Sequence, residues 1–274
     1  MLYDTHCHPN LAKNKDWEKI INNFLEENPE GFLNIIWTDL EKSKNVVKLS
    51  KKFERIFSSI WIHPCDVYGL NVENTINSLE KILIKENSPI IPFLKGDENN
   101  KIVAIWEIGL DYYWEKDKKE EQKKFFIAQI KLAKKYNLPI IIHNRDSKDD
   151  VLKILKQMNF KNFIFHCFSE NLEYAQKLLD FSPECKISFS GIVTFKNAQE
   201  IQETAKKIPL KNILVETDSP YLTPTPFRWK QENEPSFTKY VLEKIIELRN
   251  EDSKEIKKQI FENSLEVFRI KKEK

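Results

Sequence analysis

The residues best suited to chemistry in this chain are its five histidines, each at or just past the end of a short apolar run. Two further run ends carry an acid, Glu107 and Asp218. Imidazole and carboxylate together suit Zn, Mn, Fe, Co or Ni, whereas Mg prefers oxygen ligands alone. More than four candidate ligands favour two metals sharing one carboxylate, with Glu107 as the candidate bridge, over a single closed structural zinc. The histidines are His6, His8, His63, His143 and His166.

The alternative for any single histidine is an ordinary hydrogen-bonded residue, and the HxH spacing of His6 and His8 is by itself a weak motif. All five histidines fall at run ends, which favours a metal site over five unrelated hydrogen-bonded residues. Glu107 adds to it, because VAIWEIGLD (103–111) places an acid in a run with the pattern of a buried strand. A buried carboxylate is costly unless a partner compensates its charge, and bound cations would do so.

The elements that must position these side chains are short apolar runs that alternate with amphipathic stretches such as 121–136 and 197–208. This alternation predicts an α/β protein with a (β/α)8 TIM barrel, as a single domain over residues 1–274 with additional C-terminal helices after residue 235. In such a barrel the C-terminal strand ends converge on the face where active sites lie. An open doubly wound sheet is the runner-up, but no glycine-rich loop follows the first run. The strand-like runs are 1–5, 31–37, 55–61, 101–107, 138–143, 162–166, 185–190 and 212–218.

The composition is that of an ordinary globular protein, with 41% hydrophobic and 31% charged residues and a net charge of +2. So balanced a charge excludes polyanion or membrane binding by bulk electrostatics. No apolar run approaches the ~20 residues that span a bilayer, and the first residues lack a signal-peptide pattern. The four cysteines show no CxxC spacing. We therefore expect a cytoplasmic protein with reduced cysteines and no membrane partner, and we expect a monomer.

Eight segments taken together resemble the TatD family of metal-dependent hydrolases and deoxyribonucleases, within the amidohydrolase-like TIM barrels. The resemblance covers nearly the whole chain, with the motifs in the family's order. The segments are DTHCHPN (4–10), IHPCD (62–66), EIGLDYYW (107–114), PIIIHNRD (139–146), HCFSE (166–170), SGIVTFKNA (190–198), LVETDSPYLTPTPFR (214–228) and NEPSF (233–237).

The resemblance implies a hydrolase with two divalent metal ions, Mg, Mn or Zn, that activate a water molecule and clamp a phosphate. The implied metal ligands are His6, His8 and Asp218 for one ion, His143 and His166 for the other, and Glu107 as the bridge between them.

The resemblance also implies roles in catalysis and substrate binding. Asp218, Glu107 and His63 are the implied catalytic residues, with Asp218 as proton acceptor and His63 near the scissile phosphate. Arg145 would bind phosphate, since a planar guanidinium suits phosphate oxygens; a surface salt bridge is its alternative. The implied substrate and partner is DNA, hydrolysed at phosphodiester bonds from a single-stranded 3′ end. Aromatic residues past the strand ends would stack bases or simply pack the barrel mouth: Tyr112, Tyr113, Trp114, Tyr221 and Phe227.

Two other functions fit the same ligand set, because fold and metals do not choose the substrate. One is an ester or amide hydrolase such as an aminoacyl-tRNA deacylase. The other is a catalytically impaired barrel that serves as a binding protein.

The sequence departs from the family where tryptophan stands in place of glycine, at Trp37, Trp61, Trp106 and Trp229. The chain has 5 glycines, whereas average usage of ~7% would give roughly 19. Two explanations remain open. One is a genuine lineage with a narrowed site; the other is a gene whose UGA codons specify glycine but were translated as tryptophan. Coding DNA with UGG at all four positions would exclude the second.

Overall fold

The computed structural model describes residues 1–13, 16–36, 47–60, 62–86 and 101–271. Trp37 and Trp61 lie outside the described residues. Within the described part, strands and helices alternate along the chain as the sequence predicts, and contacts group the residues into two compact units. The first unit comprises residues 1–35 and 167–267, and the second comprises residues 36–166 and 268–274.

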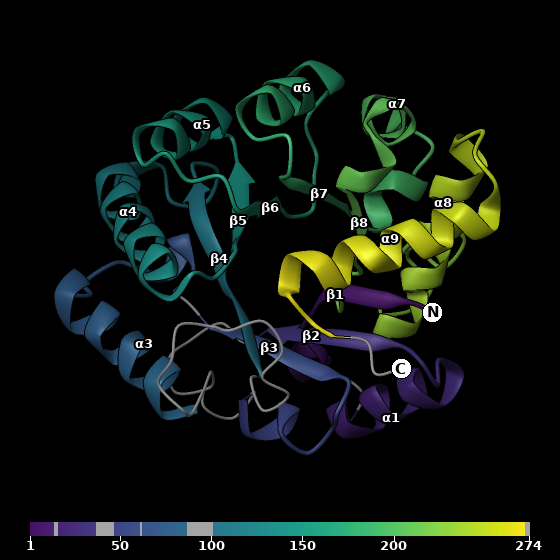
Figure 1. Cartoon of the computed structure of the whole chain (residues 1–274), viewed down its shortest axis with the longest axis horizontal. Coiled ribbons are helices and arrows are strands. Elements are labelled where there is room, and N and C mark those ends of the chain that lie inside the picture. The colour runs from purple at the N-terminus through teal and green to yellow at the C-terminus, as the bar shows by residue number, and fades with distance from the viewer. Residues whose placement is uncertain (14–15, 37–46, 61, 87–100, 272–274) are drawn as a thin grey trace. The chain divides into compact units, whose positions relative to one another are not determined.

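The second unit is built on four strands, β3 (Ile56–Ile60), β4 (Ile102–Asp111), β5 (Ile140–Arg145) and β6 (Phe163–Phe165). They pair in parallel in chain order. In Figure 1, the helices α3 (Val72–Glu86), α4 (Lys119–Tyr136) and α5 (Lys148–Gln157) lie to one side of these strands. Most residues of these strands are apolar, and β3, β4 and β6 are buried along their whole length, as expected for a parallel sheet that is covered on both faces.

Helix α4 shows how the sequence sets these boundaries. Phe126, Ile130 and Ala133 form a buried stripe with helical spacing, and α4 packs on β4. The helix ends at Asn137, which adopts a left-handed conformation with φ 52° and donates its N–H to the Ala133 carbonyl. Asparagine tolerates this conformation better than most residues, so the chain can turn there into β5.

The first unit contains β1 (Tyr3–Cys7), β2 (Phe32–Ile36), β7 (Lys186–Phe189) and β8 (Ile213–Val215). β7 pairs with β8 and β1 with β2, all in parallel, and a bridge between Cys7 and Ser219 joins the segment after β8 to β1. The order in this unit is therefore β7-β8-β1-β2, with the last strand of the chain beside the first. Both units thus carry four cyclically consecutive strands, which is the order of a (β/α)8 barrel.

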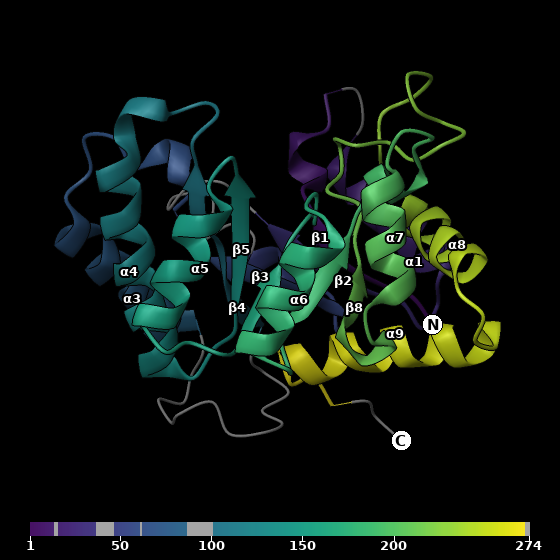
Figure 2. The ribbon, with the colours of Figure 1, turned by 90° about the horizontal axis from the view of Figure 1, so that it is seen from above.

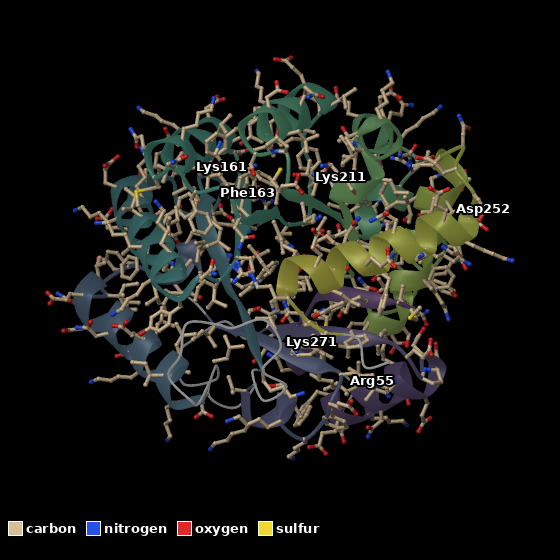
Figure 3. The ribbon with its side chains drawn as sticks, in the orientation of Figure 1. Arg55, Lys161, Phe163, Lys211, Asp252 and Lys271 are labelled. Atoms are coloured by element: carbon tan, nitrogen blue, oxygen red, sulfur yellow. The ribbon has the colours of Figure 1, made fainter. Side chains whose placement is uncertain are left out.

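Five helices accompany these strands: α1 (Trp17–Glu27), α6 (Leu172–Phe181), α7 (Gln199–Lys207), α8 (Thr238–Leu248) and α9 (Ser253–Phe268). The two helices after residue 235 confirm the predicted C-terminal extension. Asp252, labelled in Figure 3, begins α9 by accepting hydrogen bonds from the backbone N–H groups of Lys254 and Glu255. Figure 2 shows α9 near the start of β8, where Asn263 donates to the Leu210 and Ile213 carbonyls. α9 therefore holds the amino-terminal end of this strand.

The strand bounds differ from the prediction at β4. The sequence predicts an end at Glu107, but β4 continues to Asp111, so Glu107 lies inside the strand. Trp106 pairs with Ile141 and Ile108 with Ile142, so Glu107 is an extra residue at an irregularity in the ladder. Such bulges redirect a side chain and occur next to active sites. The apolar IGL that follows Glu107 continues the strand, which is why its end was misplaced.

No helix among the described residues is long and apolar enough to cross a membrane.

Gly109, two residues past the bulge, allows close pairing of β4 and β5. Its φ is +145°, and an added Cβ would lie 2.0 Å from the carbonyl oxygen of His143. We expect Gly109→Ala to lower the free energy of unfolding by about 3 kcal/mol or more, because backbone strain and overlap combine. Urea denaturation measures this.

Gly69→Ala is the matched control, since Gly69 also has positive φ (+73°) but nothing within 4 Å of an added Cβ. It should cost only about 1 kcal/mol. Equal losses in the two variants would contradict the role assigned to close pairing at Gly109.

Trp229 also has a backbone conformation that favours glycine, with φ 67° and 88% of its surface exposed. Trp229→Gly should raise the free energy of unfolding by about 0.5–1 kcal/mol, because relief of left-handed strain exceeds the entropy cost of glycine. Trp114→Gly is the control, since Trp114 is 66% exposed and has negative φ; it should lose stability. Thermal unfolding of both variants tests this, and a destabilised Trp229→Gly protein would contradict it.

Candidate metal centre

The first unit brings His6, His8 and Asp218 together at the carboxyl ends of β1 and β8. The Nε2 atoms of His6 and His8 are 2.7 Å apart. Asp218 Oδ1 lies 3.2 Å from His6 Nε2 and 3.6 Å from His8 Nε2. The backbone fixes this arrangement, because Asp218 N–H donates to the His6 carbonyl and His8 N–H donates to the Ser219 carbonyl. Three potential ligand atoms therefore converge on one point.

Asp4 stabilises the backbone around this cluster by hydrogen bonds and was not predicted from the sequence. Its Oδ1 accepts hydrogen bonds from the backbone N–H groups of His6 and Thr217, and its Oδ2 accepts one from the Thr217 hydroxyl at 2.6 Å. Burial raises the pKa of Asp4 to about 8, although the Thr217 hydrogen bonds oppose the shift. Asp4 thus ties β1 to Thr217, the residue immediately before Asp218. The acid in DTHCHPN, two residues before His6, was the available signal.

The second unit surrounds the buried carboxylate of Glu107 with three imidazoles. Oε1 lies 2.9 Å from His143 Nδ1 and 3.1 Å from His166 Nε2, and Oε2 lies 3.8 Å from His63 Nε2. Burial favours the neutral acid, but the hydrogen bonds of His143 and His166 outweigh it and hold the pKa of Glu107 well below its usual range. The compensation predicted for Glu107 is therefore supplied by imidazoles in this structure.

Trp106 lies next to this cluster rather than across its ligand atoms. Its ring is fully buried and meets the His166 ring edge to face, with centroids 4.7 Å apart. Trp106 therefore packs behind a candidate ligand and restricts the positions that the His166 ring can take.

Asp111 is a second residue that the sequence analysis missed. Its Oδ2 lies 3.0 Å from Nε2 of His143, whose Nδ1 faces Glu107. A carboxylate only accepts hydrogen bonds, so Asp111 keeps the proton on Nε2 and leaves Nδ1 as the candidate ligand atom. Burial lowers the pKa of His143, but the hydrogen bonds to Asp111 and Glu107 outweigh it and raise this pKa to about 9. Extending β4 to residue 111 in the prediction would have placed Asp111 near His143.

The donor chemistry of both clusters fits a divalent metal. In the first, two imidazole nitrogens and a carboxylate oxygen face one another, and in the second, ligand atoms of His63, Glu107 and His143 lie within 4.8 Å of one another. Neutral imidazole and carboxylate are the usual ligands of catalytic Zn and related ions. The bridging role of Glu107 stays a prediction.

Arg145 lies at the end of β5, two residues beyond His143. Its guanidinium carbon is 4.0 Å from the Tyr113 ring centroid and 5.3 Å from that of Trp114. This contact differs from the predicted alternative of a salt bridge. The guanidinium edge stays available for an anion because stacking uses only its planar face.

A family model described as "TatD related DNase" matches residues 3–269. This chain belongs to the TatD family. The metal-dependent hydrolase YabD of Bacillus subtilis, described as uncharacterized, is 39% identical over 98% of this chain and 100% of its own length. A relative from Mycoplasma genitalium with the same description is 36% identical over 97% of this chain and 98% of its own.

Solved structures agree with this assignment. The crystal structure of YJJV, a TatD homologue from Escherichia coli, matches with a TM-score of 0.84 and 26% identity over 97% of both chains. A TatD family protein from Entamoeba histolytica matches with a TM-score of 0.77 and 18% identity over 97% of both chains, which shows the fold. The predicted (β/α)8 barrel is thereby confirmed, and this TatD chain is a metal-dependent hydrolase. The extent of one domain over 1–274 stays a prediction.

The raised pKa of His143 predicts competition between protons and metal. With a pKa of about 9, His143 is protonated at pH 7 in the metal-free protein, and a metal at Nδ1 must displace that proton. We expect metal affinity to rise with pH up to about 9 and about one proton to be released at neutral pH. In the metal-free protein, the hydrogen bonds of protonated His143 stabilise the fold. This contribution to the free energy of unfolding is complete below about pH 6.5 and is lost as pH rises through 9. Calorimetry in buffers of different ionisation enthalpy counts the protons.

Asp111→Asn should reduce this proton release and weaken metal binding about 10- to 100-fold, because the supporting charge is lost. Asp150→Asn is the control, since Asp150 bonds to Tyr112 and Lys123 in the same unit. Unchanged proton release in Asp111→Asn would refute the role of Asp111.

Proposed function

We propose that this TatD protein hydrolyses phosphodiester bonds of DNA, acting as a 3′-5′ exonuclease on single-stranded ends. The observation that carries the proposal is the juxtaposition of Arg145 and two exposed aromatic rings with the histidine-rich cluster around Glu107. These groups lie on or just past the carboxyl-terminal halves of the neighbouring strands β3, β4, β5 and β6. A cation that fits phosphate and rings that fit bases therefore adjoin candidate metal ligands.

We assign one metal to His6, His8 and Asp218 and a second to His143 and His166, with Glu107 shared. Mg, Mn and Zn are the candidate ions. When bound, they would supply Lewis acidity that lowers the pKa of water and neutralises charge on phosphate oxygens.

The chain's own residues complete the site. Asp218 is partly exposed, with 17% of its side chain accessible, so its second oxygen can accept a proton from an attacking water. His63, with 20% of its side chain exposed, lies at the edge of the Glu107 cluster and can donate a hydrogen bond to a phosphate oxygen. Arg145 would hold a phosphate by its exposed edge while Tyr113 and Trp114 fix its plane.

The proposal also covers the compartment, the partner and the oligomeric state. All four cysteines are free, which supports the cytoplasm, a reducing compartment. DNA is the proposed partner, and we propose a monomer.

The test is nucleotide release from 3′-overhanging single-stranded DNA, with chelator and with added Mg, Mn or Zn. Activity should disappear with chelator and return with metal. Asp218→Asn should lower kcat about 100-fold or more, the usual scale of a lost general base. If DNA stays intact while charged tRNA releases amino acid, the nuclease proposal is wrong and the deacylase takes its place.

Arg145 is tested with a matched arginine. Arg145→Ala should raise KM for DNA about 10-fold or more, and Arg145→Lys should restore only part, since lysine lacks the planar fork. Arg55, which precedes β3 (Figure 3) and so lies at the opposite end of the strands, gives the control Arg55→Ala. Equal KM values in both alanine variants would refute the phosphate contact.

A further inference from the structure

Two neighbouring loops of the second unit expose aromatic side chains. Tyr68 follows the short 3-10 helix Pro64–Asp66 after β3 and is 69% exposed. Tyr113 and Trp114 follow β4 and are 46% and 66% exposed. Exposed apolar surface marks an interaction site when it gathers in one patch, as on neighbouring loops, rather than when single rings are scattered.

A cation accompanies the rings on each loop. Lys118 Nζ lies 4.0 Å from the Tyr68 ring centroid, and Arg145 covers Tyr113. Lys118 comes from the short 3-10 helix Lys116–Lys118, four residues after Trp114, so it links the loop after β4 to the loop after β3. We name Tyr68, Tyr113, Trp114, Lys118 and Arg145 the aromatic track.

Both loops are anchored to the Glu107 cluster. The carboxylate of Asp111 that bonds to His143 with one oxygen accepts the N–H groups of Tyr113 and Trp114 with the other, at 3.0 and 2.8 Å. The loop that carries Tyr68 starts at His63, whose Nδ1 accepts the N–H of Cys65. The track is therefore fixed to the candidate metal ligands at two points.

We propose that the aromatic track binds single-stranded nucleic acid beyond the scissile phosphate. Tyr68 stacks one base and the Tyr113–Trp114 pair another, while Lys118 and Arg145 contact the phosphates. This deepens the proposed nuclease function and rests on it for the direction of the strand.

The charges around the track favour stacking over bulk attraction. Glu115 and Asp117 alternate with Lys116 and Lys118, so acidic groups lie among the cations of this loop. Affinity should depend strongly on the bases, and its salt dependence should be set by the phosphate contacts of Lys118 and Arg145. A protein partner or a duplex would lack unstacked bases to occupy both ring sets.

The test measures binding of a fluorescent thymidine oligonucleotide of about eight residues to the full chain in chelator, by anisotropy, so that no cleavage intervenes. Tyr68→Ala should raise Kd about 5- to 100-fold, the range found for one stacked base, and Tyr68→Phe should keep wild-type affinity. An abasic strand should bind wild type no better than the normal strand binds Tyr68→Ala.

Lys118→Ala should reduce the slope of log affinity against log salt by about 0.7, as expected for one phosphate on a single strand. Lys135→Ala is the matched control, because Lys135 also lies over a tyrosine, Tyr136, but at the end of α4 that precedes β5. Its slope should not change.

The outcomes separate the two proposals. Equal affinity for normal and abasic strands, or wild-type affinity in Tyr68→Ala, overturns the track even if DNA is cleaved with metal. Binding that depends on Tyr68 supports the track, and absence of cleavage with every metal then overturns only the nuclease function. Unchanged melting temperatures for the exposed-residue variants exclude a folding defect.

Discussion

The buried carboxylate of Glu107 is the constraint on which the second unit depends. It occupies a strand interior, where an isolated charge would be prohibitive, and is held there by hydrogen bonds to His143 and His166. The bulge turns it out of the regular ladder, and the missing side chain of Gly109 lets β5 approach closely enough to present His143. The bulge and the positions of the histidines together offset the cost of removing the Glu107 carboxylate from water.

In the first unit, the candidate ligands meet because the segment after β8 lies beside β1. Hydrogen bonds between β1 and the segment after β8 place Asp218 beside His6 and His8, and Asp4 reinforces the junction. Residues more than two hundred positions apart meet because the last strand lies beside the first. The positive φ of Asp218, 56°, belongs to this junction, where a sharp turn directs the carboxylate toward the imidazoles.

Asp111 links the candidate metal ligand His143 to the exposed loop after β4. One carboxylate orients His143 with one oxygen and the loop of Tyr113 and Trp114 with the other. A change in that loop therefore reaches a candidate metal ligand through a single group. This arrangement suits an enzyme that holds its substrate near a rigid reacting centre, and it makes the loop after β4 a place where substrate preference can vary.

The sequence by itself determined the alternation of strands and helices, the (β/α)8 fold and the candidate ligands, because apolar periodicity and residue type are local properties. The tertiary structure decided which groups meet. The continuation of β4 past Glu107, the bulge, the pairing of Asp111 with His143 and the stacking of Arg145 on Tyr113 all depend on register between strands. Register is set by contacts far apart in the chain, so a run of apolar letters could place Glu107 near an end but not show that the strand continues to Asp111.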